Sequence, residues 1–309
     1  DRGDLMAIKQ VRVKINGVYT NLTKNASTGK WTGTVTAPAV TSHNQTGGYY
    51  PITVEATNDA GTTKAVDATD KTLGAALRLI VKEITKPVIK LVQPSNGAYI
   101  SNNKLPIIFD VTDETNGSGV NLSTVALKLA GTTYKDGSTG MTKTAITNGY
   151  RFTYTPQAAL ADGVKAIEIT ASDYDGNAAA KVSASYTVDT VPPTLTLSSP
   201  QTGLITNQKS CVVNGVTNDA LSSPVTVTIT HGSNSYKPSI GSNGAFSQAL
   251  TLTEGTNTIT VVAKDAAGKT TTITLTVKLD TSVPTIKSAV FAPNPVNASA
   301  SVQITLEVE

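Results

Sequence analysis

The stretch Ala263-Lys-Asp265-Ala-Ala-Gly268, followed by the run Ile273-Thr-Leu275-Thr-Val277-Lys-Leu279, decides the fold. In the run, apolar residues alternate with threonine and lysine, and this period of two predicts a β-strand with one packed face and one face in water. In the stretch before it, an acidic residue with a glycine three positions later is typical of a hairpin loop. The acidic side chain can bond to the backbone two residues on, and glycine accepts a positive φ. We therefore predict a β-hairpin here.

The same hairpin phrase occurs twice more, as Ala56-x-Asn58-x-x-Gly61 and Ala171-x-Asp173-x-x-Gly176. The three copies begin at positions 56, 171 and 263, which are 115 and 92 residues apart. Each interval is the size of one β-sandwich domain. The chain is therefore expected to repeat one small all-β domain.

A second phrase marks the starts of the domains. Pro87-Val-Ile-Lys-Leu-Val-Gln-Pro94-x-x-Gly97 returns as Pro193-Thr-Leu-Thr-Leu-Ser-Ser-Pro200-x-x-Gly203, and Pro284-Thr-Ile-Lys-Ser begins it again. The boundaries at these prolines, which we call seams, divide the chain into four parts. These are domain 1 (1–86), domain 2 (87–190), domain 3 (191–282) and a C-terminal segment (283–309). The last piece is too short to bury a core of its own. Its two expected strands, near Ile286–Phe291 and Val302–Val308, indicate the opening of a truncated fourth domain.

Other runs have the same period of two, and helical periodicity is nearly absent. One helical turn is expected at Gln157–Ala161 and another at Leu73–Leu77. Many short strands separated by Asn-Gly, Asp-Gly and Gly-Ser turns describe tandem immunoglobulin-like Greek-key β-sandwiches, an all-β fold. Because strands of about ten residues rise about 3.4 Å per residue, three such domains joined by tight proline seams are expected to form a semi-rigid rod of about 100 Å.

The three domains resemble known families. Domain 3 resembles the bacterial Ig-like domains of secreted and surface proteins, through Gly244-Ala-Phe246-Ser, Leu252-Thr-Glu254-Gly255 and the hairpin phrase at Ala263. Domain 2 resembles a sister type through Gly117-Ser-Gly119-Val120, Tyr154-Thr-Pro156 and Val188-Asp189-Thr190. Domain 1 is similar to Ig-like units of phage and prophage tail-associated proteins, through Trp31-Thr-Gly-Thr-Val-Thr-Ala37-Pro38 and Gly48-Tyr49-Tyr50. The resemblance implies no common catalytic residues.

The composition excludes several classes of partner. The 25 Lys and Arg residues against 22 Asp and Glu residues leave a charge of +3, too weak and scattered to predict binding to nucleic acid. The sequence contains no run of about 18 apolar residues, so no membrane insertion is predicted. The single cysteine, Cys211, excludes a disulfide within the chain, and we expect it to be a buried, inert thiol. The Arg2-Gly3-Asp4 tripeptide is interpreted as chance rather than as an integrin ligand.

The strongest acidic motif is Asp173-Tyr-Asp175-Gly176-Asn177. Alternating oxygen side chains followed by glycine resemble the opening of a calcium loop, with Asp173, Asp175 and Asn177 as its first ligands. The favoured alternative is an ordinary hairpin tip, because the sister hairpins lack the second aspartate, so no cofactor is expected. A second patch, formed by Asp110, Asp113 and Glu114, is interpreted as a solvated loop in preference to an inter-domain cation site.

Three aromatic residues, Trp31, Tyr49 and Tyr50, could stack on a sugar ring in a polar neighbourhood. Adjacent strand residues point to opposite faces, so at most one of the two tyrosines fills the core. The favoured interpretation is one core aromatic and one surface aromatic. Ten Tyr, four Phe and one Trp over three domains make the aromatic row of a dedicated carbohydrate-binding module sparse.

No motif indicates catalysis. His43 and His231 lie in different domains, so they form no pair for zinc or for a shared general base. No nucleophile elbow and no phosphate-binding glycine loop is present. We expect a non-enzyme.

The sequence therefore predicts a structural and adhesive Ig-like array, a tail-associated virion component that attaches weakly to a bacterial surface. The alternative is a spacer region of a secreted or cell-wall-anchored bacterial surface protein, either an adhesin or a glycan-processing enzyme. The expected partners are other virion or cell-surface proteins and a surface glycan. The two C-terminal strands are expected to lack partners of their own. Self-association through them is therefore a further expectation, because an unpaired sheet edge invites strand addition. Either setting is extracellular.

Overall fold

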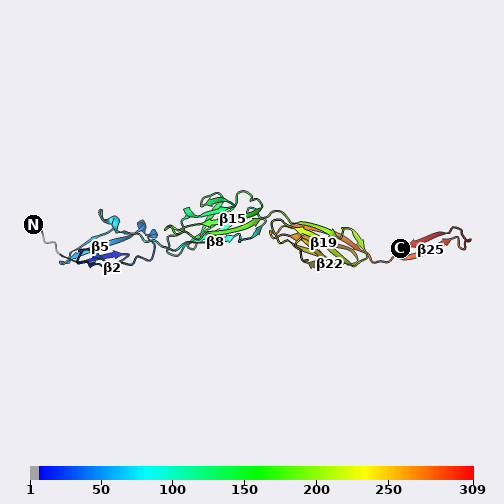
Figure 1. Cartoon of the computed structure of the whole chain (residues 1–309), viewed down its shortest axis with the longest axis horizontal. Coiled ribbons are helices and arrows are strands. Elements are labelled where there is room, and N and C mark those ends of the chain that lie inside the picture. The colour runs from blue at the N-terminus through cyan, green and yellow to red at the C-terminus, as the bar shows by residue number, and fades with distance from the viewer. Residues whose placement is uncertain (1–6) are drawn as a thin grey trace. The chain divides into compact units, whose positions relative to one another are not determined.

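The computed structural model describes residues 7–309, so the Arg2-Gly3-Asp4 tripeptide lies outside the described residues. Strands dominate, and the helical pieces are short 3-10 turns (Figure 1). Of the two expected helical turns, the one at Leu73–Leu77 is confirmed by the 3-10 turn η3 (Gly74–Leu77). The expectation at Gln157–Ala161 is wrong, because that segment is a bend in extended chain. The chain forms two compact units, one up to Val188 and one from Asp189 onward.

Domain 2 is a two-sheet sandwich. One sheet has the order β13-β14-β10-β8 and the other the order β12-β11-β15-β16-β9, where β9 pairs in parallel with β16. The pattern is that of an immunoglobulin-like sandwich. A single hydrophobic core joins both sheets, with Phe109 stacked on Phe152 in one and Leu127 and Ile169 in the other. The strands are β8 (Val88–Gln93), β9 (Tyr99–Ile100), β10 (Ile107–Thr112), β11 (Ala126–Leu129), β12 (Thr132–Lys135), β13 (Met141–Ile146), β14 (Gly149–Tyr154), β15 (Gly163–Thr170) and β16 (Val182–Val188), with the 3-10 turn η4 (Leu122–Thr124).

Domain 3 repeats this architecture, with sheets β17-β19-β22 and β18-β24-β23-β20-β21. The alternation that predicted its last strand is confirmed: Leu275 and Val277 are buried, whereas Thr274 and Thr276 are exposed. The buried side chains belong to one core shared by both sheets. The strands are β17 (Thr194–Ser199), β18 (Leu204–Thr206), β19 (Ser210–Asn218), β20 (Thr226–His231), β21 (Asn234–Tyr236), β22 (Ala245–Thr251), β23 (Gly255–Lys264) and β24 (Thr270–Leu279).

Domain 1 has a thinner core than the other two domains. Its main sheet has the order β2-β1-β5-β6, with β7 added to β5, and a separate two-stranded sheet pairs β3 with β4. The buried hydrophobic residues are Val11, Ile15, Tyr50 and Ala68. The elements are β1 (Ile8–Ile15), β2 (Val18–Asn21), β3 (Thr23–Lys24), β4 (Trp31–Thr32), η1 (Ser42–Asn44), η2 (Thr46–Gly48), β5 (Tyr50–Asn58), β6 (Thr63–Val66) and β7 (Arg78–Leu79).

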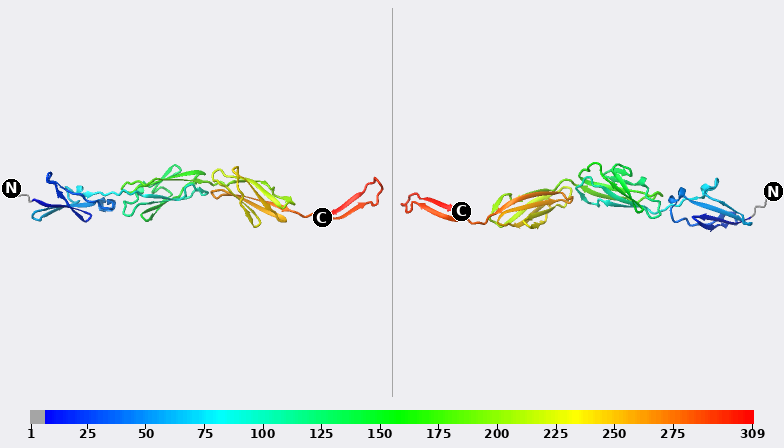
Figure 2. Two further views of the ribbon diagram at one scale, coloured as in Figure 1. Left: turned by 60° about the horizontal axis from the view of Figure 1, so that its bottom comes forward. Right: turned by 180° about the vertical axis from the view of Figure 1, so that it is seen from behind.

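The C-terminal strands differ from the expectation that they lack partners of their own. β25 (Ile286–Ala292) and β26 (Gln303–Val308) pair with each other in an antiparallel hairpin, drawn in red in Figure 2. Every residue of both strands is exposed. The hairpin therefore satisfies part of its backbone hydrogen bonding but buries no core.

The three hairpin phrases adopt one geometry, although not the expected one. The side chain accepts a hydrogen bond from the backbone N–H four residues on, not two: Asn58 from Thr62, Asp173 from Asn177 and Asp265 from Lys269, each at 2.8 Å. The glycine three positions on has a positive φ in each copy, 82°, 96° and 90°. An amide and a carboxylate therefore close this loop equally well.

Candidate functional site

Two clusters of carboxylates stand where domains 2 and 3 begin. The first acidic cluster consists of Glu83, Asp113 and Asp173, in which one ligand oxygen of each residue lies within 4.8 Å of the others. Glu83 lies in the segment between β7 and β8, Asp113 directly follows β10, and Asp173 lies in the loop between β15 and β16. The fold therefore brings together residues that are far apart in the sequence.

The carboxylates of the first acidic cluster are only partly hydrogen-bonded. Asp173 accepts backbone hydrogen bonds from Gly176 and Asn177, and Asp113 Oδ2 accepts one from the Gly119 N–H at 2.7 Å. Glu83 Oε1 accepts the N–H of Ser118. Asp113 Oδ1 and Glu83 Oε2 are buried without a hydrogen-bond partner, and so is Glu114 Oε2 of the neighbouring side chain.

Glycine at position 117 makes room for the first acidic cluster. A Cβ atom at Gly117 would lie 2.7 Å from Asp113 Oδ2 and 2.9 Å from both Glu83 Oε2 and the Glu114 carboxyl carbon. A side chain at this position would therefore displace the ends of these carboxylate side chains. Only glycine therefore leaves the carboxyl groups of Asp113, Glu83 and Glu114 in their present positions.

The second acidic cluster consists of Asp189, Asp219 and Asp265, again with one ligand oxygen of each within 4.8 Å of the others. Asp189 lies in the seam before β17, Asp219 directly follows β19, and Asp265 lies in the loop between β23 and β24. Asp189 Oδ2 accepts the hydroxyl of Ser222. Asp265 Oδ2 has no hydrogen-bond partner, although the residue is only 4% exposed.

The two clusters occupy equivalent positions. Glu83 and Asp189 stand 106 residues apart, each four residues before a seam proline, and Asp113 and Asp219 are also 106 residues apart. Asp173 and Asp265 occupy the same place in the repeated hairpin phrase. This repetition was visible in the sequence, but only the fold shows that the three positions meet.

The electrostatics of the clusters are unfavourable without a cation. Two like unit charges 4 Å apart repel by about 4 kcal/mol at an effective dielectric constant of about 20. Within residues 7–309, none of the six carboxylates forms an ion pair with a lysine, arginine or histidine. Burial, together with the neighbouring Glu114 carboxyl, raises the pKa of Glu83 above its ordinary value.

The second acidic cluster is better compensated by its own backbone. Burial acts to raise the pKa of Asp219, but hydrogen bonds from the N–H groups of Ser222 and Leu221 outweigh it, and the pKa is lowered overall. These bonds are 2.7 and 2.8 Å long. An ionised aspartate is therefore held at the end of β19.

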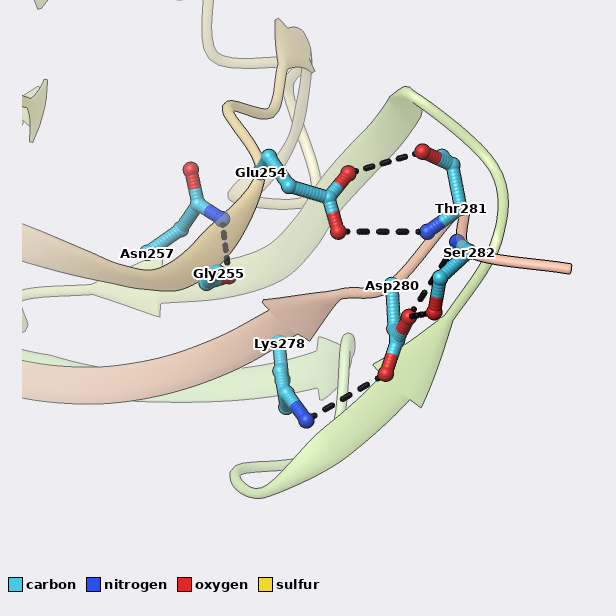
Figure 3. A network of polar contacts seen from close by, with 7 residues as sticks. All are labelled: Glu254, Gly255, Asn257, Lys278, Asp280, Thr281 and Ser282. Carbon is cyan, nitrogen blue, oxygen red and sulfur yellow. Dashed lines mark hydrogen bonds and ion pairs between the residues drawn. The ribbon is translucent and has the colours of Figure 1, made fainter. Parts of the chain in front are cut away.

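The third seam offers a contrast (Figure 3). Asp280 also stands four residues before a seam proline, Pro284, but its Oδ2 lies 3.3 Å from the Lys278 ammonium group. Its Oδ1 accepts hydrogen bonds from the backbone and the hydroxyl of Ser282. The Ser282 hydroxyl, its N–H and Lys278 together lower the pKa of Asp280. A seam carboxylate with such partners needs no cation.

The residues that the sequence suggested for calcium are used differently in the structure. Asp173 belongs to the first acidic cluster, but Asp175 Oδ2 accepts hydrogen bonds from the Thr41 hydroxyl at 2.5 Å and the Glu83 N–H at 3.0 Å. Asn177 donates to Asp173 Oδ2 and to the backbone carbonyl of Glu83. Asp175 and Asn177 therefore hold Glu83 and Asp173 in place.

The acidic patch around Asp113 also divides. Asp110 forms a two-pronged ion pair with Arg151, at 2.7 and 2.8 Å, and the hydrogen bond from Arg151 lowers the pKa of Asp110. Asp113 instead belongs to the first acidic cluster, and the Glu114 carboxyl lies next to Glu83. The expectation of a solvated loop is wrong for Asp113, which is 8% exposed.

The three candidate sugar-binding aromatics do not share one surface role. Tyr50 is 4% exposed and its hydroxyl donates to the Val40 carbonyl, so it is the core aromatic. Tyr49 lies under the Arg78 guanidinium, 4.8 Å from the ring centroid. Trp31 is half-buried in β4, and within residues 7–309 it has no ring contact. Trp31 and Tyr49 remain candidates for a glycan contact.

The two histidines and the cysteine serve structural roles. His43 stacks on Tyr174 with ring centroids 4.6 Å apart, and buried His231 bonds through Nε2 to Asn257 Oδ1 at 2.9 Å. Cys211 is buried, as expected, and burial raises the pKa of its thiol. A thiol held in its protonated form is a poor nucleophile.

Comparison with known proteins gives one family match and several likenesses to solved structures. Residues 193–281 match the family model of glucodextranase, domain B. A search of curated proteins finds no match to this chain. Among solved structures, the chain is similar to fibronectin(III)-like modules of Clostridium thermocellum CbhA, at 16% identity over 62% of this chain and 94% of that one, with a TM-score of 0.39. It is also similar to domains A168–A170 of titin, at 10% identity over 87% and 88%, with a TM-score of 0.41. A third likeness is to a bacterial ice-binding adhesin, at 20% identity over 90% and 89%, with a TM-score of 0.32.

Proposed function

We propose that the chain is a non-enzymatic array of Ig-like domains that acts as a spacer and display arm outside the cell. The observation that carries the proposal is the way domain 2 is joined to domain 1. The η1 region of domain 1 binds the loops of domain 2 through Thr41 to Asp175, Asn44 to the Gly117 carbonyl, and the stack of His43 on Tyr174. These side chains therefore join the two domains.

The matched family segment and the helices of the chain add two further observations. The family match covers only residues 193–281, which form the sandwich of domain 3, and the polar groups there serve turns and seams. Among residues 7–309, the structure contains no helix with the length and apolar character needed to cross a bilayer.

The test combines a hydrolysis assay with a pulling experiment. The purified chain is incubated with dextran and other glucans, and we expect no new reducing ends. When the chain is pulled between its termini, domains 2 and 3 are expected to unfold as separate events, because each has its own core. Glucan hydrolysis that is abolished by a point substitution would overturn the proposal.

We also propose weak attachment to a bacterial surface glycan through Trp31 and Tyr49. These are the two candidate aromatics that are not fully buried, and an aromatic face stacks favourably on a sugar ring. In co-sedimentation with purified cell walls, Trp31→Ala is expected to reduce retention. Tyr99→Ala, which removes an exposed tyrosine of domain 2, is the matched control. Equal retention of all three proteins would contradict the contact.

Two extracellular settings fit this function. The likeness of domain 1 to tail-associated units supports a virion tail, whereas the glucodextranase domain B match supports a secreted or wall-anchored bacterial protein. Mass spectrometry of purified virions and of cell-wall fractions from the source strain distinguishes them, because the chain would be enriched in only one.

The C-terminal hairpin supports a proposal of self-association. Val290, Phe291, Ile304 and Leu306 are each at least half exposed, so the hairpin presents apolar side chains and open strand edges to a partner. Sedimentation velocity should show concentration-dependent dimers that are lost in Phe291→Asp. A monomer at every concentration would contradict it.

A further inference from the structure

We propose that the chain binds two calcium ions, one at each acidic cluster, and that they fix the segments leading into domains 2 and 3. Each cluster supplies three carboxylates whose ligand oxygens lie within 4.8 Å of one another, which is the spacing of oxygens that share one cation. The ligands of each ion come from one seam residue, one strand end and one hairpin loop.

Unpartnered buried oxygens point to a ligand at both sites. Asp113 is 8% exposed and its Oδ1 has no hydrogen-bond partner, and Asp265 is 4% exposed with an unpartnered Oδ2. A buried carboxylate oxygen without a partner is costly, because ionised groups in a protein interior are normally paired or bound to a metal. A cation is the partner that would satisfy all three members of a cluster at once, since the other two members at each site are also carboxylates.

The internal repeats show which side chain the hairpin turn requires and which one the acidic cluster requires. Asn58 closes the hairpin of domain 1 with the same 2.8 Å bond that Asp173 and Asp265 make in domains 2 and 3. The turn therefore requires only a side-chain oxygen. The negative charge at Asp173 and Asp265 is explained by the clusters, because each of these aspartates belongs to one and the turn by itself needs no charge.

The chemistry of the donors favours calcium. All the ligands are oxygens, and neither cluster contains the histidine or cysteine that zinc sites use. Calcium accepts six to eight oxygens in flexible geometry, whereas magnesium requires near-ideal octahedral geometry and keeps much of its water. Loops that supply ligands from three separate segments suit the less demanding ion.

The consequence lies at the seams. Glu83 and Asp189 belong to the segments that enter domains 2 and 3, and they carry no secondary structure of their own. An ion shared with Asp113 and Asp173, or with Asp219 and Asp265, would bind each segment to two loops of the domain that follows. The seams are then stiff in calcium and loose without it.

The test measures calcium binding by the full chain after chelation and dialysis. Titration calorimetry with calcium alone is expected to show two ions per chain. Asp173→Asn and Asp265→Asn should each remove one ion, with affinity at the altered site at least tenfold weaker, and the double variant should bind none. Asparagine keeps the turn, as Asn58 shows, so these variants are expected to fold. Asp110→Asn, which disrupts the ion pair with Arg151, is the control that should keep both ions.

Hydrogen exchange supplies an independent measurement. Calcium should slow exchange at residues 81–86 and 189–192 in the wild type, and only at 189–192 in Asp173→Asn. No saturable calcium binding by the wild type at millimolar calcium would overturn the proposal. Two ions retained in the double variant would also overturn it, because they would have to bind elsewhere. Magnesium binding as tight as calcium would overturn the assignment to calcium.

Discussion

The two acidic clusters share a plan but differ in charge. Beside Asp113 the first acidic cluster has Glu114, a fourth carboxylate, whereas Asp219 is followed by Ala220. The first cluster raises the pKa of Glu83, and the second holds Asp219 ionised through two backbone N–H groups. In the second cluster a hydroxyl, that of Ser222, also bonds to Asp189. The first cluster is therefore more dependent on a cation, and the second is closer to being satisfied by the protein itself.

The difference shows how a repeated domain can keep the positions of the clustered carboxylates and change the charge around them. The strand ends and hairpins fix where the carboxylates stand, so they recur with the domain. The residues next to them set the charge count, and ligand charge count is what tunes calcium affinity in carboxylate sites. We therefore expect the first acidic cluster to bind calcium more tightly than the second.

Calcium itself should have the largest effect on stability. A ligand that binds only the folded state at 100 times its dissociation constant stabilises that state by about 2.7 kcal/mol. In calorimetric melting, chelation should lower the transition of domain 2 more than that of domain 3. In Asp173→Asn the domain 2 transition should no longer respond to calcium. A larger shift in domain 3 would reverse the comparison between the clusters.

The sequence located the strands and singled out Asp173, but it did not show the complete clusters. Alternation such as Ile273 to Leu279 predicts a strand because burial on one face is a local pattern, and the buried Leu275 confirms it. Asp173 was singled out with its sequence neighbours Asp175 and Asn177, because a motif search looks for ligands close in sequence. The true neighbours, Glu83 and Asp113, lie 90 and 60 residues away.

The pairing of the C-terminal strands was missed for a related reason. Ile286–Ala292 and Gln303–Val308 each show strand character, but which strand a segment pairs with depends on the chain between them.

A missed signal for the acidic clusters was the equal spacing of Glu83 and Asp189 from their prolines. That spacing becomes informative only once the two strand-end aspartates are known to stand 26 residues after the same prolines.

Gly117→Ala should have the next largest effect. The new Cβ atom would lie 2.7 Å from Asp113 Oδ2 and 2.9 Å from Glu83 Oε2. Overpacking costs about 1 to 3 kcal/mol, and the lower end of this range is expected because the displaced atoms are the ends of flexible side chains. Urea unfolding in calcium should show this loss in domain 2, together with weaker calcium binding there. Ser223→Ala, at the corresponding place after Asp219, is the control and should leave the second cluster's affinity unchanged. Equal effects of both variants would show that Gly117 has no special role in the first cluster.

Exchanging the residue that distinguishes the clusters should have a smaller effect. Glu114→Ala removes one negative charge from the first cluster and should weaken its calcium binding about tenfold, which corresponds to about 1.4 kcal/mol. Ala220→Glu should strengthen the second cluster. Calorimetric titration of the two variants would then reverse the order of the two sites. An unchanged order would show that charge count does not set the difference.

The smallest effect is expected from pH in the absence of calcium, because Glu83 is partly exposed and its charge is screened by solvent. Its folded pKa is raised from the ordinary 4.5, so the folded state binds a proton more tightly than the unfolded state does. The stabilisation from this proton is fully present below about pH 4.5 and is lost as pH rises through the folded pKa. Lowering the pH from 7 to 5 should therefore raise the melting temperature of domain 2 in metal-free buffer.

Asp219 provides the opposite sign for domain 3. Its pKa is lowered from the ordinary 3.8, so its stabilisation is present above about pH 3.8 and is lost only as pH falls further. Between pH 7 and 5 the domain 3 transition should gain nothing from this group. Glu83→Gln should abolish the trend in domain 2, because a neutral amide cannot titrate, and Glu254→Gln in domain 3 should leave it intact. A melting temperature of domain 2 that falls as the pH is lowered from 7 to 5 in metal-free wild type would mean that Glu83 is ionised in the folded state. The electrostatic contrast between the two clusters would then be wrong.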